Sequence, residues 1–226
     1  MKTMIFALML FCAFVPSADA SQIDAIMSEG QKAYVNGDYQ KAGACFDRAV
    51  LDAPERFDVF LYSAKALAGK GHFSLALVDV DESIRLNPDN TESFCVKSYI
   101  LQAMGEEKTA LDNINGLLLK HPQNAAVYYV RAIVNEEMDQ LDAAIDDYTK
   151  ALKFKGKTFS KKKDEIVLNL PQMPALDRKC AAIYFGRAMA YSKNGDFKKA
   201  KKDFKKAIEI EPSLIRNIPE GVLEED

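Results

Sequence analysis

Tryptophan is absent from this chain, and histidine is nearly so, with only His72 and His121 among 226 residues. A metal centre or an acid–base pair built on these two would need a third partner, and none stands at a suitable spacing. Both histidines fall at expected turns, where a solvated side chain is the ordinary interpretation. We therefore expect no catalytic residue, no bound metal and no cofactor.

Cysteine is also scarce. The chain holds Cys12, Cys45, Cys95 and Cys180, and Cys12 lies in an N-terminal segment that we expect to be removed. Three scattered cysteines do not form a disulfide framework. The mature chain is therefore predicted to carry three free thiols.

Long apolar runs are missing beyond the first twenty residues. In that segment Lys2 precedes an apolar run of 12 residues, Met4 to Val15, and Ala18-Asp19-Ala20 has the small-x-small pattern of a cleavage site. The run is too short to span a hydrocarbon core of about 30 Å as a helix. We predict a signal peptide over residues 1–20, cleaved near Ala20, and an exported mature chain without a membrane span, either periplasmic or secreted. An uncleaved anchor is the alternative.

A strong charge excess is missing too, since 30 basic and 33 acidic residues give a net charge of −3. This balance argues against a nucleic-acid partner. The charge is uneven, however: residues 21–124 carry 10 basic and 15 acidic side chains (10 − 15 = −5), and residues 159–214 carry 13 and 7 (13 − 7 = +6). Six lysines are expected on one exposed helix face: Lys198, Lys199, Lys201, Lys202, Lys205 and Lys206. We interpret this face as solvated, with an anionic partner or a head-to-tail contact between copies as the alternative.

Motifs of the common catalytic sites are missing as well. Gly156-Lys157-Thr158 resembles the end of a phosphate-binding loop, but that loop needs a glycine where Ala151 stands, and a preceding strand. No acid, base and nucleophile converge at any point of the sequence. We predict that the protein is not an enzyme.

What the chain does contain is a repeat of 34 residues. Turn-forming stretches at Gly37, Gly71, Gly105 and Asp139 follow at steps of 34, and the next, at Gly195, comes 56 residues later, which is 34 plus 22. Other columns keep this register. They comprise alanines (Ala42, Ala76, Ala110, Ala144, Ala200), small residues (Gly30, Ala64, Ser98, Ala132, Ala188) and large apolar residues (Ile26, Phe60, Phe94, Tyr128, Tyr184; Phe46, Val80, Ile114, Tyr148, Phe204).

Each column has a physical role in a pair of antiparallel helices. Small residues let two helix backbones approach closely, and large apolar residues fill the space around that contact. Glycine accepts the left-handed backbone of the turn. Proline ends the second helix in four copies, at Pro54, Pro88, Pro122 and Pro212, and Gly156 takes that place in the fourth copy. One such pair cannot bury its apolar face alone, so successive pairs must stack.

These columns resemble the tetratricopeptide repeat. The resemblance implies an all-α, right-handed solenoid of about five helix-turn-helix repeats with an insertion between repeats four and five. We place the repeats at residues 23–56, 57–90, 91–124, 125–158 and 181–214, the insertion at 159–180, and a C-terminal tail at 215–226. The chain departs from the family at a column that is often leucine and here holds Glu29, Ser63, Lys97, Arg131 and Arg187. Asn135 and Asp139 make the fourth copy the weakest match and leave its helix ends uncertain.

The resemblance also implies a concave groove lined by the first helix of each repeat. The residues it assigns to partner binding are Met27, Gln31, Tyr34, Leu61, Lys65, Cys95, Tyr99, Gln102, Tyr129, Ile133, Glu136, Phe185 and Met189. This set is unusually apolar and aromatic for an exposed face, which suits a protein or peptide segment with apolar anchors. Tyr99 and Tyr129 are expected to be anchors whose removal weakens binding more than folding. The alternative is that the superhelix or the insertion covers part of this stripe.

The insertion is the least repeat-like stretch. Its sequence places Ile166-Val167-Leu168 after three lysines, and Asp177 is a candidate N-cap for the next helix. Long loops are often functional, but an apolar flap packed on its own solenoid is an equal alternative. We predict an exported interaction scaffold that binds a partner segment in its groove. A structural protein that weakly self-associates through the solenoid ends is the second hypothesis.

Overall fold

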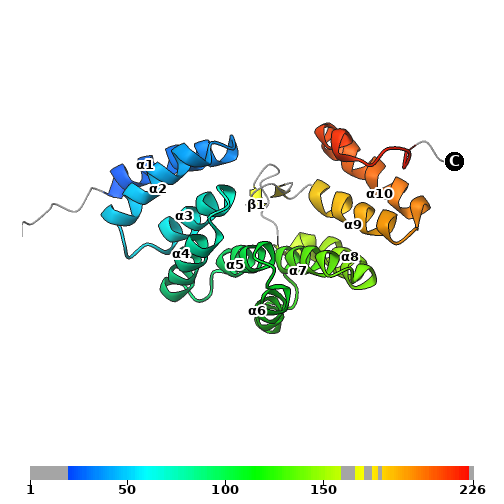
Figure 1. The fold of residues 1–226 in the computed structure, drawn as a ribbon, viewed down its shortest axis with the longest axis horizontal. Helices are drawn as coiled ribbons and strands as arrows, with labels where there is room; N and C mark the ends of the chain where they lie inside the picture. Colours follow the sequence, from blue (N-terminus) through cyan, green and yellow to red (C-terminus); the bar gives the residue numbers. More distant parts are fainter. Residues whose placement is uncertain (1–19, 159–165, 171–174, 178–179, 224–226) are drawn as a thin grey trace, which may run out of the picture.

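The computed structural model describes residues 20–158, 166–170, 175–177 and 180–223 of the chain. Within these ranges the helices follow one another in pairs along an arch that runs from α1 to α10 (Figure 1). Their bounds are α1 (Ala20–Val35), α2 (Tyr39–Asp52), α3 (Phe57–Gly69), α4 (Phe73–Leu86), α5 (Thr91–Ala103), α6 (Glu107–Lys120), α7 (Ala125–Glu137), α8 (Leu141–Thr158), α9 (Ala181–Lys193) and α10 (Phe197–Ile210). The prediction of an all-α solenoid with an insertion between the fourth and fifth pairs is confirmed.

The core of the solenoid lies along the predicted columns. All five alanines of the alanine column are 0% exposed, as are Ala64, Ser98, Ala132 and Ala188 of the small column. At Gly30 a side chain would be impossible without movement, because a Cβ atom there would lie 2.5 Å from the Phe46 ring. Close approach of the paired helices therefore depends on small side chains at these positions.

The turns inside the pairs share one backbone conformation. Gly37, Gly71, Gly105 and Gly195 have φ angles between 77° and 80°, in the left-handed region that favours glycine. In the fourth pair Asp139 takes this place with a φ of 57°. The backbone hydrogen bond that closes the turn is kept, since Gln140 N donates to Asn135 O at 2.8 Å, as Asp38 N donates to Ala33 O at 2.9 Å in the first pair.

The ends of the second helices follow the prolines. Four of these helices have 14 residues and end two residues before a proline. Helix α8 instead continues through Gly156 to Thr158 and reaches 18 residues, because a glycine keeps the backbone N–H that a helix needs. The extra turn joins two helices, since Ala125 N donates to Thr158 Oγ1 at 2.7 Å.

The described part of the insertion forms a small antiparallel pair of strands. Strand β1 (Ile166–Leu168) pairs with β2 (Leu176–Asp177), and Figure 1 places β1 inside the arch. The expectation that Asp177 is the N-cap of α9 is wrong. Cys180 holds that position with a φ of 65°, and its backbone N–H donates to Asp177 Oδ1 at 3.0 Å.

The C-terminal segment closes the last helix pair. A 3-10 helix, η1 (Pro212–Asn217), follows α10, and Val222 is buried against Ala188, Ala200 and Phe204. The predicted tail thus continues the packing of repeat five as far as the structure describes it. Among the described helices, none has the length and apolar character needed to cross a membrane.

Candidate functional site: the concave groove

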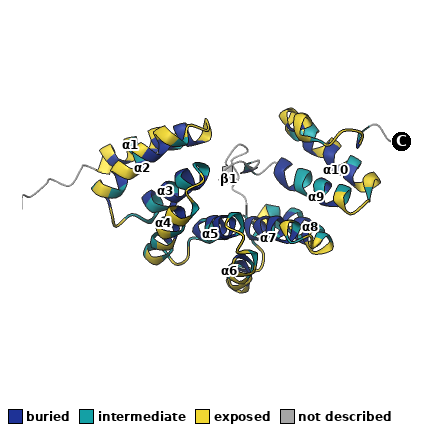
Figure 2. Cartoon of the chain, viewed as in Figure 1, coloured by how far each residue is buried: buried dark blue, intermediate teal, exposed yellow. Residues whose placement is uncertain are grey.

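The first helices of the pairs line the inside of the arch. Figure 2 shows mainly buried and half-buried residues on α5 and α7, whereas α6, on the outside, carries many exposed ones. The thirteen residues assigned from the sequence divide into two groups. Eight are buried, with 0–9% exposure: Met27, Tyr34, Leu61, Lys65, Cys95, Tyr99, Tyr129 and Ile133. Five are half-buried: Gln31, Gln102, Glu136, Phe185 and Met189.

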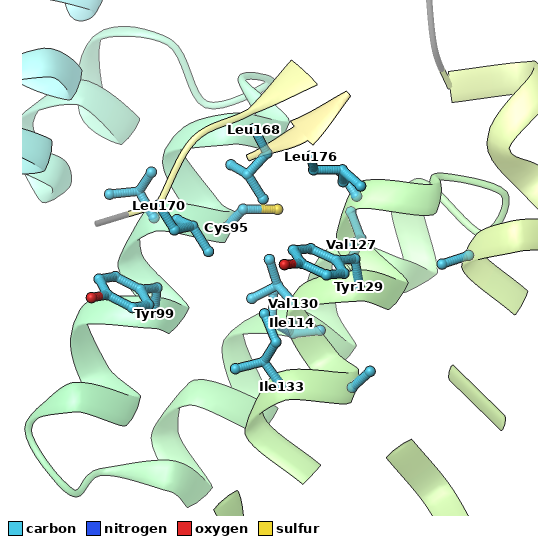
Figure 3. Close-up of a cluster of buried hydrophobic side chains, with 14 of the residues drawn as sticks. Cys95, Tyr99, Ile114, Val127, Tyr129, Val130, Ile133, Leu168, Leu170 and Leu176 are labelled. Atoms are coloured by element: carbon cyan, nitrogen blue, oxygen red, sulfur yellow. The ribbon is translucent and has the colours of Figure 1, made fainter. Parts of the chain in front are cut away.

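The centre of the groove is filled by the insertion. Leu168 and Leu170 are 2% exposed and Leu176 is 0% exposed, and all three belong to the main hydrophobic core together with Cys95, Tyr99 and Tyr129. Figure 3 shows the three leucines above these side chains of α5 and α7. The described residues of the insertion therefore pack on their own solenoid, as expected for an apolar flap, which is one of the two alternatives that the sequence left open.

The insertion also reaches the first repeat. The Tyr34 hydroxyl of α1 donates to the backbone oxygen of Asn169 at 3.2 Å. Beside this contact the buried ammonium of Lys65 pairs with the Glu92 carboxylate and lies 4.8 Å from the centre of the Tyr62 ring. Burial, with Glu92 and Asp58 nearby, raises the pKa of Tyr62 to about 12. The Lys65 ammonium is thus used in an ion pair within the protein.

Tyr129 is a core residue. Its ring lies 6.1 Å from the Tyr148 ring between centroids, and burial, followed by the charge of Glu136, raises the pKa of its hydroxyl. Removing such a ring leaves a cavity and destabilises the fold. This burial argues against the expectation that Tyr129 can be removed with little effect on folding, and thermal melting of Tyr129→Ala is the measurement that tests it. Tyr99, at 9% exposure, lies at the edge of the same cluster.

An open pocket remains beside the insertion. It has a volume of about 440 Å³ and lies among α5, α7 and α9, with contributions from α4, α8 and η1. Its lining comprises Phe73, Tyr99, Gln102, Ala103, Tyr129, Ile133, Glu136, Glu137, Tyr148, Ala182, Phe185, Gly186, Met189 and Asn217. Seven of the thirteen assigned residues are in this set, so the pocket brings together the assigned residues of repeats three, four and five, with the exception of Cys95.

The pocket combines apolar walls with one acidic edge. Glu136 accepts a hydrogen bond from the Tyr148 hydroxyl at 3.1 Å and an ion-pair contact from Lys193 Nζ at 2.8 Å. Burial, then the Glu136 charge, raises the pKa of Tyr148. Gly186 makes this arrangement possible, because a Cβ atom there would lie 2.6 Å from the Tyr148 ring. The arrangement suits an apolar side chain bound beside a few fixed polar groups.

A smaller pocket lies on the other side of the insertion. It has a volume of about 200 Å³ and is lined by Gln31, Tyr34, Val35, Tyr62, Lys65, Glu92 and Asn169. Three assigned residues, Met27, Leu61 and Cys95, line neither this pocket nor the larger one. Asn169 of the insertion is part of this lining, so the insertion forms one wall of the smaller pocket.

Several residues of the larger pocket are not among those assigned from the sequence. Tyr148 had been assigned only to a packing column, and Gly186 lies directly after an assigned residue, Phe185, on the same helix. Asn217 comes from the segment described as a tail. A faint signal existed for Gly186, since a helical glycine next to an aromatic residue often marks a close approach.

Other candidates from the sequence stay apart from the groove. His72 is exposed at the start of α4, and His121 is half-buried at the end of α6. No group of three or more metal-ligating side chains occurs within the described ranges. Five of the six lysines of α10 are exposed and Lys201 is half-buried. No disulfide joins Cys45, Cys95 and Cys180 in the part of the chain that the structure describes, and thiol counting remains the test of the predicted number.

The fold and the groove define a class, the helical-repeat proteins that stack antiparallel helix pairs around a concave surface. Sequence models of the tetratricopeptide repeat match residues 27–91, 125–158 and 181–214. The chain belongs to the tetratricopeptide repeat family. No curated protein matches the sequence.

Solved structures show the same fold at low sequence identity. A tetratricopeptide repeat protein from Thermus thermophilus is 18% identical, with 86% of this chain and 94% of that chain covered and a TM-score of 0.70. A structure of MamA is 20% identical over 89% of this chain and 100% of that chain, with a TM-score of 0.53. MamA from Desulfovibrio magneticus RS-1, from residue 41 to its end, is 18% identical over 85% and 96%, with a TM-score of 0.55. These likenesses show the fold alone.

Proposed function

We propose that the mature chain is an exported interaction scaffold that holds a segment of a partner protein in its concave groove and performs no catalytic step. One observation carries the proposal. The pocket of about 440 Å³ joins half-buried apolar side chains, Phe185 and Met189, to the half-buried Gln102 and to the Glu136 carboxylate, which the Tyr148 hydroxyl and Lys193 Nζ hold in place. A mostly apolar concavity with a few oriented polar groups is the usual form of a binding site.

Self-association through the ends of the solenoid is the weaker candidate. At the C-terminal end, Val222 packs against Ala188, Ala200 and Phe204, so part of the face on which a second copy would stack is already covered. Light scattering over a range of protein concentrations tests this candidate. A mass that rises with concentration would favour self-association over the scaffold function.

The experiment for the scaffold function uses a matched pair of variants. Met189→Ser removes an apolar side chain from the pocket, and Leu119→Ser removes one from α6, where Leu119 is 87% exposed. We expect a protein captured by the wild-type mature chain from its native compartment to be retained by Leu119→Ser. Met189→Ser should weaken its binding by about 5- to 30-fold, as for a residue contributing 1–2 kcal/mol at an interface. Equal binding by both variants, with wild-type thermal melting, would exclude this pocket.

Export is part of the proposal and has its own test. The motivation is the apolar run from Met4 to Val15 followed by Ala18-Asp19-Ala20. Intact-mass measurement on the native protein should give a chain that begins at Ser21. Retention of Met1 together with membrane fractionation would instead indicate an uncleaved anchor.

A further inference from the structure

The inner surface of the arch already holds an extended segment. Residues 166–168 form β1, and Asn169 and Leu170 continue from it across the groove. Leu168 and Leu170 are each 2% exposed, whereas Asn169 between them is half-buried. In an extended chain, side chains two residues apart share a face. Leu168 is the last residue of β1 and Leu170 follows it by two residues, and both bury their side chains against the inner helices.

The leucines pack on helices that are far from the insertion in the sequence. Cys95 and Tyr99 come from α5 and Tyr129 from α7, and Figure 3 shows Leu168 and Leu170 next to these residues. The main-chain contact comes from α1, where the Tyr34 hydroxyl donates to Asn169 O. This combination of apolar seats and a hydrogen bond to the main chain is how proteins recognise an extended peptide.

We propose that the insertion is an internal ligand of the groove. The partner is then an extended segment that carries two large aliphatic side chains two residues apart and replaces Leu168 and Leu170. The inference rests on the proposed scaffold function and adds to it the chemistry of the partner and a competition for the site. The open pocket at Met189 and Phe185 is where a longer segment gains contacts, since no described residue of the insertion lines that pocket.

The insertion has an advantage over a separate partner because it is covalently linked to the groove that it occupies. A linked segment acts at an effective concentration that reaches millimolar values for short connections. An external segment with the same contacts is therefore excluded at micromolar concentrations. A partner displaces the insertion only if it makes additional contacts, and weakening the insertion lowers the concentration it requires.

The test uses the full mature chain and a synthetic probe. The probe is a fluorescent peptide with the sequence of residues 164–177, and its matched control has serine in place of both leucines. The main variant is Leu168→Ser with Leu170→Ser, and Leu119→Ser on the outside is its control. By fluorescence anisotropy, we expect the double variant to bind the probe at least about 10-fold more tightly than the wild type or Leu119→Ser. The serine peptide should bind none of them.

Cys95 supplies a second measurement. It is 0% exposed, and burial, then Glu92, raises the pKa of its thiol. In a background of Cys45→Ser and Cys180→Ser, we expect a thiol reagent to modify Cys95 at least about 10-fold faster in the double variant. The probe peptide should slow the modification again. Leu176→Ser, which keeps Leu168 and Leu170, provides the same test if the double variant loses its helical circular dichroism.

Equal probe affinity for wild type and the double variant, or no binding to a folded double variant, overturns the inference. A captured partner that binds wild type and double variant equally also overturns it, while the scaffold function stands. If no captured protein depends on Met189, the scaffold function fails, and the peptide result then describes the internal contact alone.

Discussion

Repeats two and four differ in one pair of side chains that joins their two helices. The pair is Ser63 and Asp79 in repeat two, and Arg131 and Asp147, at the equivalent positions, in repeat four. In repeat four, Arg131 forms a bidentate pair with Asp147: Nε to Oδ2 at 2.8 Å and Nη2 to Oδ1 at 2.7 Å. Asn135 Nδ2 donates to the same carboxylate at 2.9 Å. In repeat two the pair is Ser63 and Asp79, joined by one hydrogen bond of 2.6 Å. Repeat five, with Arg187 and Asp203, follows repeat four.

The difference shows in the electrostatics. Asp147 is 2% exposed and lies against a guanidinium, which can balance its charge. Asp79 has only a hydroxyl, and burial raises its pKa, with Asp47 adding to the effect and the Ser63 hydrogen bond opposing it. The negative charge of the carboxylate is thus balanced by an arginine in repeat four, whereas in repeat two burial disfavours the charged form of Asp79.

The turns of the two repeats show the opposite pattern. Repeat two has Gly71 at a φ of 78°, whereas repeat four has Asp139 at 57°. A side chain in the left-handed region costs free energy that glycine avoids. Repeat four therefore combines the stronger polar pair with the weaker turn. A repeat can keep its fold with either feature compromised, because its alanine and aromatic columns carry the packing.

The largest effect that follows from this comparison is expected at Asp147. Asp147→Ala leaves the partly buried Arg131 guanidinium without its carboxylate and should lower the free energy of unfolding by about 2–4 kcal/mol. Asp79→Ala, the equivalent change in repeat two, should cost less than about 1 kcal/mol, since only a hydroxyl loses its acceptor. Urea denaturation at neutral pH measures both. Equal losses would show that the two pairs contribute alike.

A transplanted arginine sharpens the comparison. Ser63→Arg places a guanidinium near Asp79, which accepts a hydrogen bond from Ser63, and near Asp47 of repeat one, whose charge acts on Asp79. We expect the free energy of unfolding to rise by about 0.5–1.5 kcal/mol, as for a charge-assisted hydrogen bond. Ser63→Arg combined with Asp79→Asn is the control and should lose most of the gain. A gain that persists in the double variant would assign it to packing of the arginine stem.

The pH dependence of repeat two provides a further test. Because the pKa of Asp79 is raised in the folded state, its ionisation destabilises the fold as pH rises through and above its unfolded value of about 3.9. Asp79→Asn keeps an acceptor for Ser63 and removes the charge. It should raise the free energy of unfolding by up to about 1 kcal/mol at pH 7 and by progressively less as pH falls toward 4. Denaturation at pH 7, 5 and 4 measures the trend, and a constant difference would contradict it.

The smallest effect is expected at the turn of repeat four. Asp139→Gly relieves the left-handed conformation, while the greater freedom of glycine in the unfolded chain offsets part of the gain, so a net stabilisation of about 0.5 kcal/mol is expected. Gly71→Asp in repeat two should lose a similar amount. Thermal melting of both variants measures them, and a loss at Asp139→Gly would mean that the aspartate side chain stabilises its turn.

The fold could be predicted from the sequence, because the residues that set the helices, turns and helix ends recur in several copies of the repeat. The alanine column, the turn glycines and the prolines act over a few residues, and agreement between copies fixes the register without any knowledge of distant contacts. The same local logic explains two details. Helix α8 passes through Gly156 where prolines end the other second helices, and Asp139 takes a turn normally left to glycine.

The site could be predicted only in part. The positions of the inner-helix residues followed from the repeat, and half-buried Gln102, Phe185 and Met189 do line an open pocket. The exposure of the inner-helix residues could not be predicted from the repeat, because it depends on whether the insertion packs on them. Tyr129 and Cys95 had the pattern of groove residues, but the leucines of the insertion bury them.

By itself, then, the sequence determined the order of helices, their turns and the surface that faces inward. Only the tertiary structure decided that described residues of the insertion occupy the groove and that an open pocket lies beside Glu136. It also decided that Arg131 and Arg187, at a position that is often leucine in the family, pair with aspartates. The physical reason is distance along the chain. Tyr34 and Asn169 are 135 residues apart and still form a hydrogen bond, and a contact of that kind exists only once the solenoid has curved to bring α1 and the insertion together.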